Sequence, residues 1–156
     1  MKSVLMVCLG NICRSPLAEG VLRYKLEKAG IKNIRVDSAG TSDYHVGDPP
    51  DTRSAQNAKQ HGIDISNLCG RQFSVTDFDE FDLIYVMDAS NYQNVIRLAR
   101  NESDKTKVDF LLNAKWPGKN MAVPDPYYGS GDGFEKVFQL VDEACEEIVK
   151  RVLSSG

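Results

Sequence analysis

Cys8 and Arg14 flank a short loop, and these two side chains suit the binding of a tetrahedral oxyanion and an attack on it by sulfur. An apolar run at residues 3–8 precedes the loop, and Ser15-Pro16 after it is typical of a helix start. The first N–H groups of a helix lack partners within it, so together with the helix dipole they bind anions and favour a thiolate. A guanidinium binds two phosphate oxygens at once. The spacing therefore predicts a nucleophilic Cys8 and a phosphate-binding Arg14.

The residues between these side chains are expected to shape the loop. Gly10 and Asn11 suit backbone N–H groups that turn inward, because Gly and Asn adopt positive φ more readily than most residues. Ser15 has the residue type of a helix N-cap, and its hydroxyl can also donate to the Cys8 sulfur. Cys13 either fills space behind the loop or forms a reversible disulfide with Cys8 that protects this sulfur from oxidation. We expect phosphate to be bound by Leu9, Gly10, Asn11, Ile12, Cys13, Arg14 and Ser15.

Asp125 is the candidate acid. Asp-Pro is a common turn dipeptide, but Asp125 has Pro124 and Pro126 on its two sides, and these stiffen the backbone. Tyr127 and Tyr128 follow as possible aromatic walls. A fixed carboxyl group can donate a proton to a departing phenolate, an effect typically worth about 10²–10⁴-fold, and can later activate water. We therefore predict that Asp125 lies near Cys8 and acts as a general acid.

Other residues receive weaker predictions. Tyr44 forms either an opposing wall of the pocket or an ordinary exposed loop side chain, so the predicted substrate pocket consists of Leu9, Tyr44, Tyr127 and Tyr128. Asp88 is most simply a helix N-cap, and Cys69 and Cys145 are expected to pack in the interior. His45 has no obvious partner in the sequence. Neither of the two histidines is expected to be catalytic.

The elements that must position these residues alternate between strands and helices. Strands are predicted at residues 3–8, 34–37, 81–87 and 107–112, and helices at 16–29, 51–61, 91–99 and 133–153. The last helix has a clear apolar stripe. This order predicts an α/β fold over residues 1–156, a single doubly wound domain with a four-stranded parallel sheet and helices on both faces.

Such a fold would bring distant residues together. Ligands of doubly wound sheets bind beyond the carboxyl ends of the strands. Four segments should therefore meet at one edge of the sheet, namely residues 8–15, 38–50, 88–90 and the stretch that leads to 124–129.

Composition restricts the class of protein. The net charge of −3 argues against nucleic acid and against anionic membranes as partners. No apolar run approaches the ~18 residues of a membrane span, and no signal peptide opens the chain. Four irregularly spaced cysteines and two histidines match neither a disulfide framework nor a zinc site. We therefore expect a cytoplasmic protein with reduced cysteines.

The chain resembles the low-molecular-weight protein-tyrosine phosphatases over essentially its whole length. The motif Cys8-Leu9-Gly10-Asn11-Ile12-Cys13-Arg14-Ser15-Pro16 and the distant Asp125-Pro126-Tyr127-Tyr128-Gly129 carry the resemblance, with residues 37–41, 49–51 and 87–88 in support. It implies hydrolysis of phosphotyrosine and small aryl phosphates through a phosphocysteine at Cys8, with Arg14 as the phosphate ligand and Asp125 as the general acid.

The resemblance also concerns the residues around the loop and the partners. It implies that Ser15 stabilises the thiolate and that Asn11 and Ser38 belong to a network that holds the loop, with Asp88 as a further supporting residue. No metal or organic cofactor is expected. The expected partners are phosphotyrosine-containing proteins or peptides, with inhibition by phosphate-like oxyanions, and we expect a monomer.

Some residues depart from the family or bear on rival functions. Leu68 stands where many members have a histidine, and Tyr44 stands where some have tryptophan. A thiol-dependent arsenate reductase needs a closely spaced cysteine pair downstream, whereas Cys69 and Cys145 are far apart. Arginine phosphatases tend to have a small polar residue in place of Ile12 and lack the paired tyrosines. A module that only binds phosphate would need no nucleophile.

Overall fold

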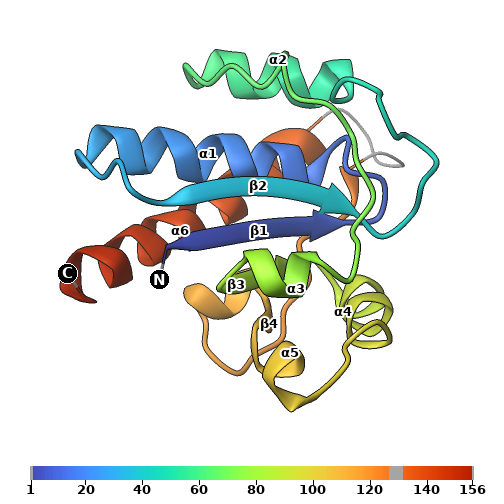
Figure 1. Cartoon of the computed structure of the whole chain (residues 1–156). Coiled ribbons are helices and arrows are strands. Elements are labelled where there is room, and N and C mark those ends of the chain that lie inside the picture. The colour runs from blue at the N-terminus through green and yellow to red at the C-terminus, as the bar shows by residue number, and fades with distance from the viewer. Residues whose placement is uncertain (1, 127–131, 156) are drawn as a thin grey trace.

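The computed structural model describes residues 2–126 and 132–155, and a parallel sheet lies at its centre (Figure 1). The strands are β1 (Ser3–Cys8), β2 (Arg35–Gly40), β3 (Leu83–Val86) and β4 (Val108–Phe110), arranged in the order β2-β1-β3-β4. The helices are α1 (Arg14–Lys28), α2 (Thr52–Gln60), α3 (Asp77–Glu80), α4 (Ala89–Ile96), α5 (Glu102–Thr106) and α6 (Gly133–Ser155), with a 3₁₀ helix, η1 (Leu111–Ala114), after β4. The predicted four-stranded parallel α/β fold is confirmed.

Helices cover both faces of the sheet. In Figure 1, α1, α2 and α6 lie on one side of it, and α3, α4 and α5 lie on the other. Successive side chains of a strand point to opposite faces. Val4, Met6 and Cys8 therefore join the core under α1 and α6, while Leu5 and Val7 join the second core. Cys8 thus ends the central strand on the face that α1 covers.

The ends of several elements differ from the prediction. β2 continues to Gly40, three residues beyond the predicted end, because Gly40 pairs with Cys8 and forms a bridge to Gln72. Ser38 therefore lies in a strand and not in the following loop. β3, β4 and α4 are shorter than predicted, and the short helices α3 and α5 were not predicted. A window of four or five residues carries too little periodicity to reveal such helices.

The predictions about which residues pack in the interior are partly confirmed. The apolar stripe of α6 is buried as predicted, and Cys145 is fully buried in it. Cys69 is exposed, so its predicted packing role is wrong. It lies in the loop that passes over residues 45–48, where its thiol donates to the Gly47 carbonyl at 3.6 Å. None of the helices within residues 2–126 and 132–155 is both long enough and apolar enough to cross a membrane.

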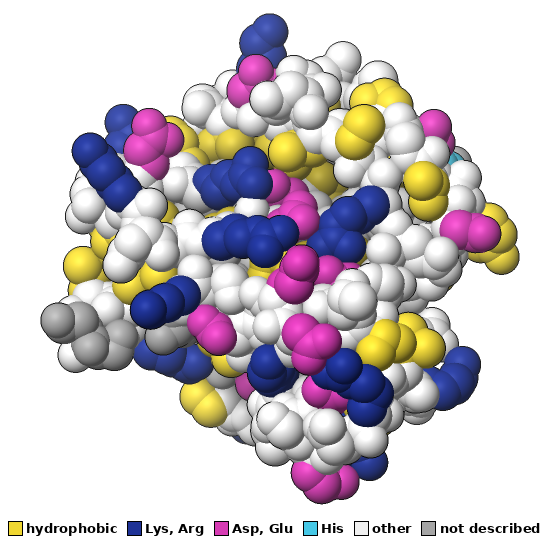
Figure 2. Space-filling model, viewed as in Figure 1, with side chains coloured by type: hydrophobic (Ala, Val, Ile, Leu, Met, Phe, Trp, Pro, Cys, Tyr) yellow, Lys and Arg dark blue, Asp and Glu magenta, His cyan; other side chains and the backbone are white. Residues whose placement is uncertain are grey.

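The surface carries both signs of charge. Figure 2 shows Lys and Arg side chains lying among Asp and Glu side chains near the middle of the face that Figure 1 presents. Arg35 of β2, for instance, pairs with Glu80 at 3.7 Å, and Arg71 pairs with Asp37 at 3.1 Å. Such exposed pairs contribute little to stability individually, but they leave this face without a large field of either sign.

A cluster of hydrogen bonds joins the end of α2 to the beginning of α6. His61 Nε2 lies 2.8 Å from Glu135 Oε1, and the His61 ring stacks on Phe138 with a centroid distance of 3.7 Å. Asn57 and Gln139 also donate to the Glu135 carboxylate. The hydrogen bond with His61, followed by those from Gln139 and Asn57, lowers the pKa of Glu135 to about 2. This cluster helps to fix where α6 starts.

We predict that Glu135→Gln destabilises the protein in a pH-dependent manner. Near neutral pH the melting temperature should fall by about 1 to 3 °C, because the contacts of a partly exposed carboxylate contribute at most about 1 kcal/mol. The folded-state pKa lies below the ordinary value of 4.5, so this stabilisation is fully present above that pH and is lost as the pH falls towards 2. Thermal melts of both proteins should therefore converge at low pH, and a difference independent of pH would contradict this assignment.

Candidate active site

The loop between β1 and α1 has a shape that few sequences tolerate. Asn11 has φ 57°, as its residue type predicts, whereas Gly10 does not have positive φ. A Cβ atom at position 10 would lie 3.1 Å from Cδ2 of His45, which is a tight contact with the neighbouring loop. The expectation of positive φ at both positions is therefore right for Asn11 only.

The end of β2 supports this loop from behind. A Cβ atom on Gly40 would lie 2.8 Å from the Leu9 carbonyl oxygen, 3.0 Å from the Gly10 carbonyl carbon and 3.1 Å from the Asn11 nitrogen. All three contacts are with backbone, which cannot move aside without changing the loop. The residue after Gly40 also donates its N–H to the Cys8 carbonyl at 2.9 Å. Close backbone approach thus fixes the loop against the sheet.

Two donors surround the buried Cys8 sulfur. Ser15 Oγ lies 3.1 Å from Sγ, and the Asn11 backbone N–H donates to Sγ at 3.3 Å. The predicted N-cap role of Ser15 is wrong, because α1 already begins at Arg14 and its N-cap is Cys13, without a side-chain capping bond. The Ser15 hydroxyl is instead directed at the sulfur. Hydrogen-bond donors at this position stabilise a thiolate.

A chain of polar side chains holds Asn11 in place. Its Nδ2 donates to Ser15 Oγ at 2.7 Å and to Ser38 Oγ at 2.9 Å, and its Oδ1 accepts from the Arg71 backbone N–H at 3.0 Å. Ser38 in turn donates to Glu19 Oε1 at 2.7 Å. The structure therefore brings together Asn11, Ser15 and Ser38. Glu19 was not singled out from the sequence, although an acidic residue on the buried face of a helix was a visible signal.

The segment opposite the loop does not use the family histidine. Leu68 is half-buried and packs against the hydrophobic core. Support for Asn11 comes from the Arg71 backbone, and the Arg71 side chain is anchored by Asp77 at 3.0 Å and by Asp37 at 3.1 Å. The substitution at position 68 thus leaves the amide of Asn11 fully hydrogen-bonded.

Arg14 is buried in the first turn of α1 and is held from two sides. Its Nη1 donates to Asp88 Oδ2 at 2.8 Å and to the Val123 carbonyl at 3.0 Å, while its Nη2 lies 3.7 Å from Asp125 Oδ2. Asp88 also caps α4 as predicted, since it accepts from the Asn91 N–H. Its bond to Arg14 was not predicted from the residues. It follows from the topology, because Asp88 comes just after β3 at the same edge of the sheet.

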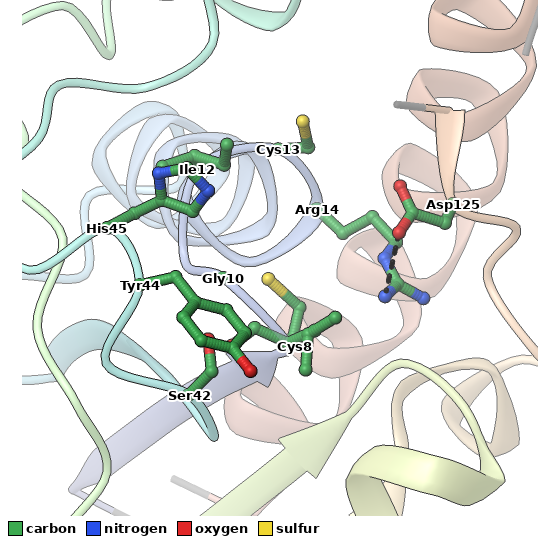
Figure 3. A pocket seen from close by; sticks show the side chains of 10 residues that line it. Cys8, Gly10, Ile12, Cys13, Arg14, Ser42, Tyr44, His45 and Asp125 are labelled. Atoms are coloured by element: carbon green, nitrogen blue, oxygen red, sulfur yellow. Dashed lines mark hydrogen bonds and ion pairs between the residues drawn. The ribbon is translucent and has the colours of Figure 1, made fainter. Parts of the chain in front are cut away.

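These groups line one pocket of about 170 Å³. Figure 3 shows the Cys8 sulfur directed into it, with Arg14 and Asp125 on one side and Tyr44 and His45 on the other. The complete lining consists of Cys8, Leu9, Gly10, Ile12, Cys13, Arg14, Ser42, Tyr44, His45 and Asp125. The predicted meeting of four segments at one edge is confirmed for their described residues. Tyr127 and Tyr128 lie outside the described residues.

The structure changes the interpretation of two residues beside the pocket. His45, for which the sequence offered no partner, has its Nδ1 3.0 Å from Asp48 Oδ2. Burial raises the pKa of Cys13 to about 12, with smaller contributions from Asp51 and Cys8, so Cys13 remains a neutral thiol. Its disulfide with Cys8 stays a prediction. Among residues 2–126 and 132–155, no cluster of three or more His, Cys, Asp or Glu side chains could hold a metal ion.

We predict that Asp88→Ser separates the two roles of this side chain. Serine still caps α4, so the melting temperature should change little, but its shorter side chain cannot reach Arg14. Losing one charge-assisted hydrogen bond should lower kcat/KM for an aryl phosphate by about 10- to 100-fold. Thermal melts and steady-state kinetics of the variant measure both quantities. Unchanged kinetics would show that Arg14 does not need this support.

Comparison with known proteins places the site in context. The sequence profile described as "Low molecular weight phosphotyrosine protein phosphatase" matches residues 3–155. The human protein of that name is 43% identical over 152 residues, which are 96% of this chain and 95% of the human protein. A protein tyrosine phosphatase structure from Entamoeba histolytica superposes with a TM-score of 0.92 at 34% identity, covering 99% of each chain. A Drosophila arginine phosphatase superposes with a TM-score of 0.89 at 35% identity, covering 97% of this chain and 98% of the other.

Proposed function

Because this chain belongs to the low molecular weight phosphotyrosine protein phosphatase family, we propose that it hydrolyses phosphotyrosine in proteins or peptides, and small aryl phosphates. One observation carries the proposal for these residues. The Cys8 sulfur, the Arg14 guanidinium and the Asp125 carboxyl group line a single pocket although the last two are far apart in the sequence. A nucleophile, an anion ligand and an acid are the groups that this reaction needs.

The first step transfers the phosphoryl group to sulfur. The inward N–H groups of the loop and the Arg14 guanidinium bind the phosphate oxygens, and they stabilise the charge that develops on them. The Cys8 thiolate attacks phosphorus, so an S–P bond forms while the bond from phosphorus to the phenolic oxygen breaks. Asp125, in its protonated form, gives its proton to the departing oxygen. The products are the dephosphorylated tyrosine residue of the substrate and a phosphocysteine at Cys8.

The second step returns the enzyme to its starting state. The Asp125 carboxylate takes a proton from water, and the water oxygen attacks phosphorus. The S–P bond then breaks and inorganic phosphate leaves. The Ser15 hydroxyl, 3.1 Å from Sγ, donates to the sulfur as it becomes an anion again. Because phosphate and similar oxyanions fit the same loop, we expect them to inhibit competitively.

The walls of the pocket favour an aromatic substrate. Leu9, Ile12 and Tyr44 present apolar surface around the sulfur, and Tyr44 is 79% exposed. A phenyl ring gains by leaving water for such surface, whereas the guanidinium of phosphoarginine would lose hydrogen bonds to water and find no acceptor on Ile12. This argument supports phosphotyrosine over phosphoarginine as the substrate. One of the similar structures is named an arginine phosphatase.

The direct test is to trap the intermediate. Full-length enzyme mixed with a phosphotyrosine peptide labelled with ³²P and quenched rapidly in acid should carry the label on Cys8, and Cys8→Ser should neither turn over nor become labelled. Phosphoserine and phosphoarginine peptides of the same sequence serve as comparisons. Labelling of another residue would refute the mechanism, and preferred turnover of phosphoarginine would refute the proposed substrate class.

We predict that Asp125→Ala slows catalysis according to the leaving group. For phosphotyrosine, whose phenolate needs a proton, the rate of intermediate formation should fall by about 10²–10⁴-fold. For p-nitrophenyl phosphate, whose leaving group is a stable anion, the loss should be much smaller. Rapid-quench measurements of the first step with both substrates give the two ratios. Equal losses for both substrates would exclude Asp125 as the acid.

A further inference from the structure

We infer that Glu19 is a positioning residue of this reaction, which acts through Ser38 and Asn11 to keep the Ser15 hydroxyl pointed at the Cys8 sulfur. The inference rests on the proposed role of Cys8 as nucleophile. Glu19 lies on α1 and does not line the pocket, so any effect on catalysis must pass through these hydrogen bonds.

The position of Glu19 demands an explanation. It is only 2% exposed, and its neighbours on the same helix, Ala18, Val21 and Leu22, are fully buried apolar residues. Burying a carboxylate is costly unless it is paired and hydrogen-bonded. One oxygen accepts from Ser38 Oγ at 2.7 Å, and the other pairs with Arg23 at 2.7 Å.

The directions of the hydrogen bonds follow from the chemistry of the Asn11 amide. Its Nδ2 can only donate, and its two hydrogens go to Ser15 Oγ and Ser38 Oγ. The amide cannot turn over, because Oδ1 already accepts from the Arg71 N–H. Each serine oxygen therefore accepts from Asn11 and has one hydrogen left. The hydrogen of Ser38 goes to Glu19. For the hydrogen of Ser15, the Cys8 sulfur at 3.1 Å is nearer than the other acceptor, the Ala39 carbonyl at 3.4 Å.

An ionised Glu19 keeps the hydrogen bonds of this chain in a single donor-to-acceptor direction. A carboxylate only accepts, so it draws the Ser38 hydrogen away from Asn11. A group at position 19 that can donate to Ser38 would allow the Ser38 hydrogen to face Nδ2, where two donors would meet. Burial raises the pKa of Glu19, while the bond from Ser38 and the charge of Arg23 oppose this rise. Asp37 and Arg71 are the other charged groups that act on it.

Two effects of removing the charge have opposite signs, which makes the inference testable. Loss of a negative charge near Cys8 would favour its thiolate through space. Loss of the Ser15 orientation would disfavour it, because the sulfur would lose a donor. If the hydrogen-bonded chain dominates, neutralising Glu19 must make Cys8 less reactive.

The experiment measures the alkylation rate of Cys8 in the full-length protein with iodoacetamide, followed by mass spectrometry of the peptide that holds Cys8. In Glu19→Gln at neutral pH, where the wild-type Glu19 is to be compared in its ionised form, we expect the rate to fall about tenfold, the value of one oriented hydrogen bond. Ser38→Ala, which keeps the Glu19 charge, should cause a similar fall. The double variant should react no more slowly than either single one, because both break the same chain.

Asp104→Asn is the matched control. Asp104 is also buried, at 3% exposed, and is paired with Arg100 at 2.9 Å, but it lies on α5, away from the loop. The Asp104→Asn variant should be less stable than the wild type, but its Cys8 should be alkylated at the wild-type rate. Should Glu19→Gln fail to fold, Ser38→Ala carries the test.

The possible outcomes separate this inference from the proposed function. Unchanged or faster alkylation in Glu19→Gln, or additive losses in the double variant, would overturn the role of Glu19 while wild-type turnover of phosphotyrosine stands. A wild-type enzyme that forms no phosphocysteine would overturn the proposed function, and the alkylation rates would still decide whether Glu19 orients Ser15. A fall in kcat with little change in KM for the aryl phosphate further supports positioning.

Discussion

The proposed chemistry depends on one constraint, which is that the loop after β1 must keep one shape in which its backbone N–H groups can bind an anion. Such a loop contains a residue in the left-handed region, Asn11, and buried polar groups that must all be satisfied. Two neighbours meet these demands. The backbone of Gly40 leaves no space for the loop to relax backwards, and the side chain of Asn11 uses both amide hydrogens and its oxygen. The loop is therefore preorganised, which is what electrostatic stabilisation of a transition state requires.

The parallel sheet explains why so few residues are enough to hold Arg14 in place. All four strands point their carboxyl ends to one edge, so the segments after β3 and β4 each contribute one group to Arg14, which itself follows β1. Arg14 is fixed by Asp88 and by the Val123 carbonyl, which belong to different segments. A guanidinium held at two points loses less conformational entropy when it binds a phosphate.

The residues that belong to a short, local pattern could be predicted from the sequence. Cys8, Arg14 and the loop between them form a short pattern with a strand before it and a helix after it, and the parallel topology then brought Asp125 to the same edge. The sequence could not reveal pairings that only the packed fold creates. For Ser15 the sequence offered both a helix N-cap and a contact of its hydroxyl with the Cys8 sulfur. Only the packed fold, in which α1 begins at Arg14, shows that the hydroxyl lies 3.1 Å from the sulfur and does not cap the helix.

The hydrogen bonds of Asp88 with Arg14 and of Glu19 with Ser38 could not be predicted from the sequence, and the two cases share a physical reason. Asp88 and Glu19 act through partners 74 and 19 residues away, and no local pattern records such distances. Their positions nevertheless give the two carboxylates different roles around the Cys8 sulfur. In the proposed mechanism Asp88 holds the cation that binds phosphate, Glu19 ends the chain of hydrogen bonds that leads to the sulfur, and Asp125 lies 3.7 Å from Arg14. The three carboxyl groups can therefore differ in role, because Asp88 and Glu19 accept hydrogen bonds from the groups that support the loop, whereas Asp125 lines the pocket in which the proposed leaving group would depart.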